Sequence, residues 1–210
     1  MPNARSLSDW RLYVIVDRDA IAGRDPALIA EQAIRGGADV IQLRDKRGGA
    51  RELIDAGRRV LAVTQSAGIP LIINDRPDIA VAIGAQGVHL GQDDLPVETA
   101  RRILGPDAII GKSTHSIEQA MTGASEPVSY IAVGPVFATP TKPDYGQVGL
   151  ELVRDVTSRV SKPVVAIGGI DAATLPSVRA AGARCVAVVR AVCGESDPES
   201  AARALKRALI

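Results

Sequence analysis

The chain has 210 residues, of which 46% are hydrophobic and 23% are charged, as in an ordinary globular protein rather than a disordered segment. Its formal net charge of +1 at pH 7 argues against bulk attraction to nucleic acid, and no apolar stretch approaches the roughly 18 residues that a membrane-spanning helix needs. Aromatic residues make up only 2%, so the core is expected to be aliphatic, which suits parallel strands covered by helices.

Short runs rich in Val, Ile and Leu recur along the chain and predict strands, and most of them are followed directly by Gly, Asp or Asn. These runs span residues 11–16, 40–43, 71–73, 88–90, 108–111, 130–133, 164–167 and 185–189.

The segments between these runs carry helix signals. Asp25-Pro26 and Asp197-Pro198 each read as a capping residue followed by proline in the first turn, and Asp171 is expected to cap a helix that ends near residues 181–182. Residues 36–39, 84–87 and 181–184 repeat a glycine helix stop that leads directly into a strand.

Eight such strand–helix units with right-handed crossovers close most simply into a compact (β/α)8 TIM barrel, a single domain over residues 1–210. The alternative is an open doubly wound sheet. No Gly-x-Gly-x-x-Gly follows the first strand, which weakens the dinucleotide-binding form of that alternative.

The two cysteines, Cys185 and Cys193, are too few for a disulfide framework and lack a zinc-ligand spacing. Cys185 lies in an apolar run and is interpreted as a core residue. The polar segment 1–10 has no apolar signal-peptide core. We therefore expect a cytoplasmic protein whose partners are small molecules, not nucleic acid or a membrane; a homo-oligomer remains an open alternative.

Two predicted strands lead into aspartates. Residues 71–73 are followed by Asn74-Asp75, and residues 88–90 are followed by Gly91-Gln92-Asp93-Asp94. If these strands are neighbours, Asp75 and Asp94 lie at the same rim of the sheet, and a hard dication such as Mg2+ would relieve their repulsion. Two alternatives remain: Asn74-Asp75 is also common turn chemistry, and either Asp93 or Asp94 would serve as a helix cap near Pro96.

The second strand ends with residues that suit an anion. Gln42, Arg44 and Lys46 alternate along the chain and so share one face, where a guanidinium fork and an ammonium would bind phosphate oxygens. The alternative is that Arg44 and Lys46 are merely solvated at a strand end.

Later strand ends and loops add further candidates. Ser113 and Thr114 are hydroxyl donors, although Thr114 or Ser116 would equally cap the next helix, and His115 is either a general base or a loop residue. His89, within a strand, is interpreted as a satisfied barrel histidine. Thr139, Thr141 and Lys142 lie in the longest polar loop and have the character of phosphate donors on a lid. Gly168-Gly169 and Arg190 follow the last two strands, where barrels often hold a phosphate.

Taken together in order, these segments resemble the thiamine phosphate synthase family, also called thiamine-phosphate pyrophosphorylase, over nearly the whole chain from Leu12 to Val192. The specific pieces are QLRDK at 42–46, INDR at 73–76, GVHLGQDDLP at 87–96, STH at 113–115, GPVFATPTK at 134–142 and AIGGI at 166–170.

The resemblance implies a barrel that joins hydroxymethylpyrimidine diphosphate to thiazole phosphate and releases diphosphate, by Mg2+-assisted dissociative substitution. Arg44, Lys46, Ser113 and Lys142 would be catalytic and would also bind substrate. Gln42, Asn74, Thr139, Thr141, Gly169, Val189 and Arg190 would complete the binding set, and Asp75 and Asp94 would hold the metal.

The chain departs from the family at two positions. Arg190 stands where the family usually has serine, and Lys112 where it usually has an apolar residue. The alternatives are a thiazole tautomerase-like isomerase that uses His115 as acid and base, and a non-catalytic paralogue that binds thiamine precursors. Asp75, Asp94 and the cationic cluster favour the synthase.

Overall fold

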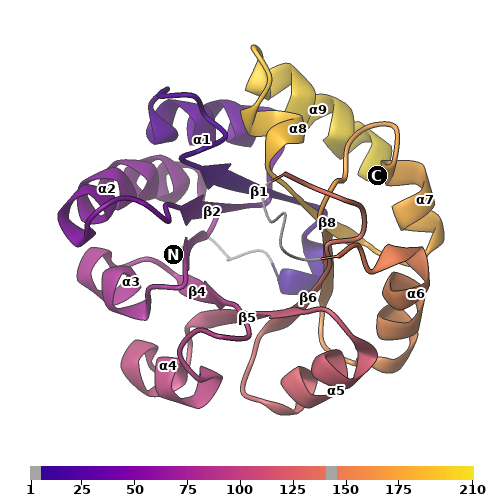
Figure 1. The fold of residues 1–210 in the computed structure, drawn as a ribbon. Coiled ribbons are helices and arrows are strands. Elements are labelled where there is room, and N and C mark those ends of the chain that lie inside the picture. The colour runs from indigo at the N-terminus through magenta and orange to yellow at the C-terminus, as the bar shows by residue number, and fades with distance from the viewer. Residues whose placement is uncertain (1–5, 141–145) are drawn as a thin grey trace.

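Eight parallel strands close into a barrel in a computed structural model of the chain, which describes residues 6–140 and 146–210. Figure 1 looks along the barrel, with the helices arranged around the strands. Each strand pairs with its neighbours in chain order and β8 closes on β1, so the predicted (β/α)8 barrel is confirmed. The strands are β1 Leu12–Asp17, β2 Val40–Arg44, β3 Leu71–Asn74, β4 Gly87–Leu90, β5 Ile109–Thr114, β6 Tyr130–Val133, β7 Val164–Ile167 and β8 Cys185–Val188.

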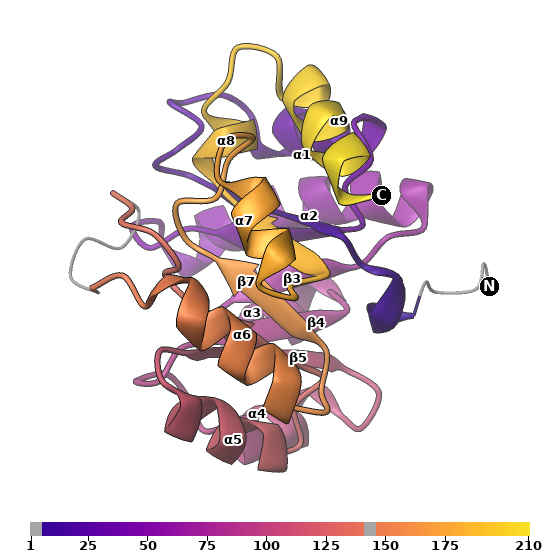
Figure 2. The ribbon, with the colours of Figure 1, turned by 90° about the vertical axis from the view of Figure 1, so that its right-hand side faces the viewer.

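Helices follow the strands and cover the outside of the barrel, after a short 3-10 helix, η1 Leu7–Asp9. Figure 2 shows η1 at one end of the barrel and the loop that follows β6 at the other. In the described part of the chain, none of these helices is long and apolar enough to cross a membrane. The helices are α1 Pro26–Arg35, α2 Ala50–Ala67, α3 Pro77–Ile83, α4 Val97–Leu104, α5 Ile117–Ser125, α6 Gly149–Arg159, α7 Leu175–Ala180, α8 Arg190–Cys193 and α9 Pro198–Leu209.

Alternation along the strands divides the buried residues into two cores. Outward-facing residues such as Leu43 and Ile73 pack against the helices. Inward-facing residues such as Tyr13 and Tyr130 fill the lower barrel, and Trp10 packs edge-on against both. Successive side chains on a strand point to opposite faces, so the polar residues at strand ends alternate in the same way.

Several predicted boundaries hold. The Asp25 carboxylate accepts a hydrogen bond from the Ala27 N–H (3.0 Å) at the start of α1, and Asp197 accepts from the Ser200 N–H (3.0 Å) at the start of α9. Ser116 rather than Thr114 caps α5, through the Gln119 N–H (3.2 Å).

Other boundaries differ from the prediction. Strand β5 continues to Thr114 because the ladder to β6 extends that far. Of the alternatives, the helix cap by Asp93 or Asp94 is not what the structure has: α4 starts at Val97 with Pro96 as its N-cap, and the Asp94 carboxylate accepts the Gly91 N–H (2.6 Å). Asp171 organises the turn before α7, through the N–H groups of residues 173 and 174, but the helix cap itself is Thr174.

Candidate active site

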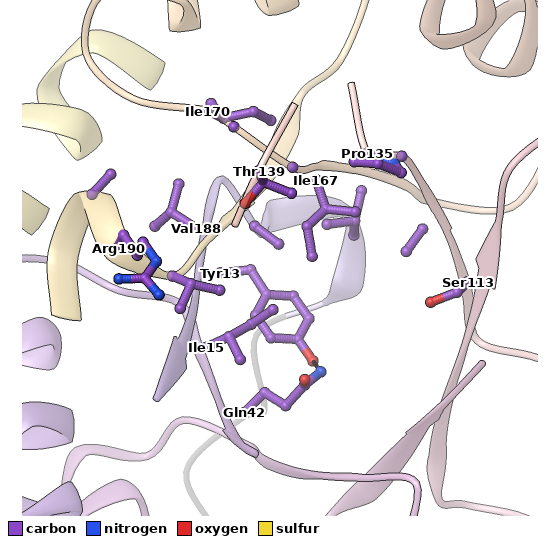
Figure 3. Close-up of a pocket in the computed structure, with 18 of the residues that line it drawn as sticks. Tyr13, Ile15, Gln42, Ser113, Pro135, Thr139, Ile167, Ile170, Val188 and Arg190 are labelled. Carbon is purple, nitrogen blue, oxygen red and sulfur yellow. Dashed lines mark hydrogen bonds between the residues drawn. The ribbon is translucent and has the colours of Figure 1, made fainter. Parts of the chain in front are cut away.

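A cavity of about 420 Å3 opens where the strands end. Figure 3 shows it between Ser113 on one side and Arg190 on the other, with Tyr13 and Gln42 below. Of the residues predicted for the site, those that line this cavity are Gln42, Arg44, Asn74, Ser113, Thr139, Gly169, Val189 and Arg190. Lys46, Asp75 and Asp94 form a separate group beside it. Thr141 and Lys142 lie outside the described residues.

Arg44 reaches the cavity from the end of β2 and forms an ion pair with Asp17 at the end of β1. The two residues are paired in the strand register, and their side chains are 12% and 3% exposed. The Arg44 Nε is buried and makes no hydrogen bond in the structure. Asp17 holds the guanidinium in place while Arg44 lines the cavity, so its charge is directed toward a bound anion.

Asp17 was not among the site residues predicted from the sequence. The available signal was the alternation of Tyr13, Ile15 and Asp17 along β1, which places the carboxylate on the same inward face as the tyrosine.

Lys46, Asp75 and Asp94 come together at the neighbouring rim. The Lys46 ammonium forms an ion pair with Asp75, and the Asp94 carboxyl group lies close enough to Asp75 to interact with it electrostatically. Burial raises the pKa of Asp75, and the adjacent Asp94 raises it further, while Lys46 opposes both effects. The two acids are thus neighbours, as predicted, and the lysine lies directly against one of them.

The backbone at Asp75 is unusual. Its φ of 61° is left-handed, a region that non-glycine residues seldom adopt, although aspartate tolerates it better than most. Its N–H donates to the His89 carbonyl (2.8 Å), which extends the β3–β4 pairing by one residue. This conformation turns the carboxylate out of the strand direction and toward the lysine and Asp94.

The loop after β4 is held by β5. Lys112 is 8% exposed and donates from Nζ to the Gly91 carbonyl (2.9 Å), while Asp94 accepts the N–H of the same Gly91. Gln92 donates to the Ser113 carbonyl. These bonds fix the segment that carries Asp94 against the strand that carries Ser113.

A line of hydrogen bonds crosses the cavity floor. Gln42 Nε2 donates to Tyr13 Oη (2.7 Å), the two tyrosine hydroxyls lie 3.0 Å apart, and Tyr130 Oη lies 2.9 Å from His89 Nδ1. His89 Nε2 lies 2.8 Å from Ser113 Oγ. The interpretation of His89 as a satisfied barrel histidine is confirmed, and Tyr13 and Tyr130 are site residues that were not predicted from the sequence.

His115 lies at the cavity wall with its Nδ1 on the Gly134 carbonyl. A carbonyl accepts, so Nδ1 carries the hydrogen. The sequence offered no partner to orient this histidine; the structure supplies one from the loop after β6.

Comparison with known proteins identifies the family. The family model described as thiamine monophosphate synthase matches residues 12–192. A thiamine-phosphate synthase from Roseiflexus sp. is 49% identical over 92% of this chain and 83% of its own, and one from Mycobacterium sp. (strain KMS) is 47% identical over 100% and 96%.

The chain belongs to the thiamine monophosphate synthase family. Among solved structures, the thiamine phosphate pyrophosphorylase from Pyrococcus furiosus matches 99% of this chain and 98% of its own at a TM-score of 0.89 and 35% identity. The predicted family and the prediction of an enzyme are therefore confirmed, and the family supports synthesis of thiamine phosphate as the activity.

In this member of the family, the opposite side of the cavity is built from the ends of β7 and β8. Gly169 has a φ of 63°, and a Cβ there would come within 2.7 Å of Phe137 Cβ, so only glycine allows the β6 loop to lie this close. Arg190 is exposed and opens the four-residue helix α8. Figure 3 shows its guanidinium beside the cavity, across from Ser113.

The acidic pair suits Mg2+ better than a metal that needs a full protein cage. Within residues 6–140 and 146–210, no three His, Cys, Asp or Glu side chains gather as a metal-binding group. Mg2+ commonly uses one or two carboxylates and completes its octahedron with water and substrate phosphate oxygens. Asp75 and Asp94 therefore fit that ion, provided that a phosphorylated ligand lies beside them.

Proposed function

We propose that this enzyme joins hydroxymethylpyrimidine diphosphate to thiazole phosphate and releases diphosphate, as a Mg2+-assisted transferase. The observation that carries this proposal is that Arg44 lines a cavity large enough for two small rings, while Lys46, Asp75 and Asp94 form a group beside it. Cations and metal-binding acids are what a diphosphate leaving group requires.

In the proposed reaction the bond between the pyrimidine methylene carbon and the diphosphate oxygen breaks, and its electron pair leaves with the diphosphate. The thiazole nitrogen then supplies its lone pair to that carbon and becomes part of a thiazolium ring. No protein nucleophile and no proton transfer are needed for these two events. The chain therefore has to stabilise the leaving group and align two rings.

Individual residues have separate tasks in this scheme. Arg44, anchored by Asp17, and Lys46 take charge from the diphosphate, and Ser113 and Gln42 orient the pyrimidine from the cavity floor. Asp75 and Asp94 would hold Mg2+, which supplies positive charge to the departing diphosphate. Thr139, Gly169, Val189 and Arg190 would receive the thiazole phosphate, and the roles of Thr141 and Lys142 on the lid stay predictions from the sequence.

The test is to incubate the purified protein with both substrates, with and without Mg2+, and to measure thiamine phosphate. We expect product that depends on both substrates and on the metal. Product formation that survives complete removal of divalent ions would overturn the metal assignment. No product in any condition would overturn the proposed reaction.

A second candidate function rests on His115. Its Nδ1–H donates to the Gly134 carbonyl, which orients the imidazole at the cavity wall, where a thiazole tautomerase-like isomerase would use it as acid and base. Conversion of one thiazole tautomer to the other, in the same preparation and without a pyrimidine substrate, would establish this activity. His115→Gln is expected to abolish it.

A further inference from the structure

Five polar side chains connect opposite sides of the barrel in one unbroken series, which we call the floor relay: Gln42, Tyr13, Tyr130, His89 and Ser113. Each consecutive pair lies at hydrogen-bond distance, between 2.7 and 3.0 Å. All five residues line the cavity, and the two end members, Gln42 and Ser113, each have a hydrogen-bonding atom that the series does not use.

The number of hydrogens on each group determines which atom donates and which accepts in every bond of the relay. The Gln42 amide donates to Tyr13, so the single Tyr13 proton is directed to Tyr130 Oη. Tyr130 then donates its own proton to His89 Nδ1, and a neutral imidazole with an accepting Nδ1 carries its hydrogen on Nε2. That hydrogen is donated to Ser113 Oγ, which leaves the Ser113 hydroxyl proton for the cavity.

The phenols suit this role. Burial raises the pKa of both Tyr13 and Tyr130, so both hydroxyls keep their protons and act as donors at neutral pH. Their rings pack edge to face with centroids 6.0 Å apart. The donors are therefore held by the barrel core and do not depend on a ligand for their position.

Strand β5 provides the space that the relay needs. Gly111 is the register partner of both His89 and Tyr130, so it stands between them on the inner surface of the barrel. A Cβ at this position would lie 2.3 Å from Tyr130 Oη and 2.6 Å from His89 Nδ1. Any other residue would occupy the path of the hydrogen bond, which indicates that this contact is built into the fold.

We propose that the relay contains three positioning residues: Tyr13, Tyr130 and His89. They fix the hydrogen-bonding roles that the two ends present to the cavity, with Gln42 Oε1 as an acceptor and the Ser113 hydroxyl as a donor. A ring that fits between them needs an amine N–H at one edge and an unprotonated ring nitrogen at the opposite edge. A 4-aminopyrimidine has this pattern, because its N1 lies across the ring from the amine.

The 4-oxo analogue presents an oxygen where the amine was, and two acceptors then face each other at Gln42. A buried polar group left without a partner is costly, so a site of this kind rejects the mismatched ring strongly. This part of the inference rests on the proposed function, since it names the feature by which the pyrimidine is chosen.

The histidine tautomer tests the relay without any substrate. The chain contains only two histidines, so a two-bond 1H–15N spectrum at pH 8 has two imidazoles to assign, and His115→Gln identifies the signals of His89. We expect His89 as the neutral Nε2–H form in the free wild-type protein. Finding His89 as the Nδ1–H form or as an imidazolium would overturn the proposed donor and acceptor assignments along the relay.

Two tyrosine variants form a matched pair, since each removes one buried hydroxyl from the floor. Tyr130→Phe takes away the donor to Nδ1, and we expect the His89 signals to move toward a mixture of tautomers. Tyr13→Phe leaves that donor in place, and we expect the wild-type tautomer while Gln42 becomes free to rotate. A Tyr130→Phe protein with the wild-type tautomer would overturn the proposal.

Ligand choice is measured separately, by calorimetric titration with 4-amino-5-hydroxymethyl-2-methylpyrimidine and with its 4-oxo analogue. We expect wild type to prefer the amine by at least tenfold and both tyrosine variants to lose most of that preference. Unchanged preference in the variants would overturn the proposal. If a tyrosine variant fails to fold, Ser113→Ala takes its place: we expect the Nε2–H tautomer to persist and amine binding to weaken, and an altered tautomer counts against the relay.

These readouts are independent of turnover. A protein that shows the expected tautomer and ring preference, but forms no thiamine phosphate, would refute the proposed reaction and leave the relay standing. A protein that forms thiamine phosphate but carries His89 as Nδ1–H would refute the relay alone.

Discussion

Replacing Asp75 with Asn is the sharpest test of the acidic pair. The change removes one negative charge and keeps the side-chain shape, while Asp94 and the loop that holds it stay in place. A carboxylate about 2.1 Å from a dication gains about 4 kcal/mol even at the dielectric constant of water. The native pair would gain less than this from a bound dication, because Asp75 and Asp94 repel each other and Asp75 already has Lys46 as a partner.

We therefore expect Mg2+ to activate Asp75→Asn with a constant at least tenfold higher than wild type and turnover to fall at least tenfold, where a tenfold loss corresponds to about 1.4 kcal/mol. The assay is the initial rate of thiamine phosphate formation against Mg2+ concentration at saturating substrates. Asp94→Asn is expected to behave alike. Asp93→Asn is the matched control, since Asp93 is exposed and adjacent to Asp94 in the chain.

Wild-type activation by Mg2+ in both Asp75→Asn and Asp94→Asn would refute the assignment. An equal loss of Mg2+ activation in Asp93→Asn would refute the specific role of Asp75 and Asp94. It would show that general negative charge at the rim attracts the metal.

Three other predictions concern the thiazole side, the base of the barrel and the thiols. Arg190→Ser is expected to raise KM for thiazole phosphate about tenfold with little change in kcat, since a charged donor to phosphate is lost; a lower KM would mean that the arginine crowds the site. Lys206→Met removes the ammonium from Asp39, which is 1% exposed, and should cost about 3 kcal/mol and lower Tm by roughly 6–12 °C; Arg207→Met, on the exposed side of α9, is the control, and equal Tm values for the two would contradict the argument. Burial raises the pKa of Cys193 to about 12 and also raises that of Cys185, so neither thiol forms thiolate at pH 8 and a disulfide-exchange reagent should react with both only after unfolding.

The candidate site divides into parts that the sequence could predict and parts that it could not. Gln42 and Arg44 were predictable because strand alternation puts both on the face opposite Leu43, and the structure has them lining the cavity. Asp75 and Asp94 were predictable as neighbours because consecutive parallel strands end at one rim. The alternative of a helix cap at Asp93 or Asp94 could not be decided from the sequence, because the fold of the loop determines that Asp94 accepts the Gly91 N–H and that Pro96 is the N-cap of α4.

The order of strands and helices followed from local pattern alone. Apolar runs of strand length, proline in first turns and glycine stops are short-range signals, and the right-handed crossover leaves few ways to connect eight of them. The acids and cations that follow the strands could be placed in the same way. All the strands are parallel, so residues at their carboxyl ends lie at the same rim of the barrel.

Only the tertiary structure decided which side chains meet across the barrel. Asp17 and Arg44, or Tyr13 and Tyr130, are far apart in sequence, and whether they touch depends on the register between strands and on closure of β8 against β1. Gly111 shows what the sequence alone could not predict. In the sequence it is one glycine in a strand, but in the barrel its missing Cβ leaves the space in which Tyr130 contacts His89. Local chemistry determined the type of each group, while barrel closure determined the partners with which it shares a proton or a charge.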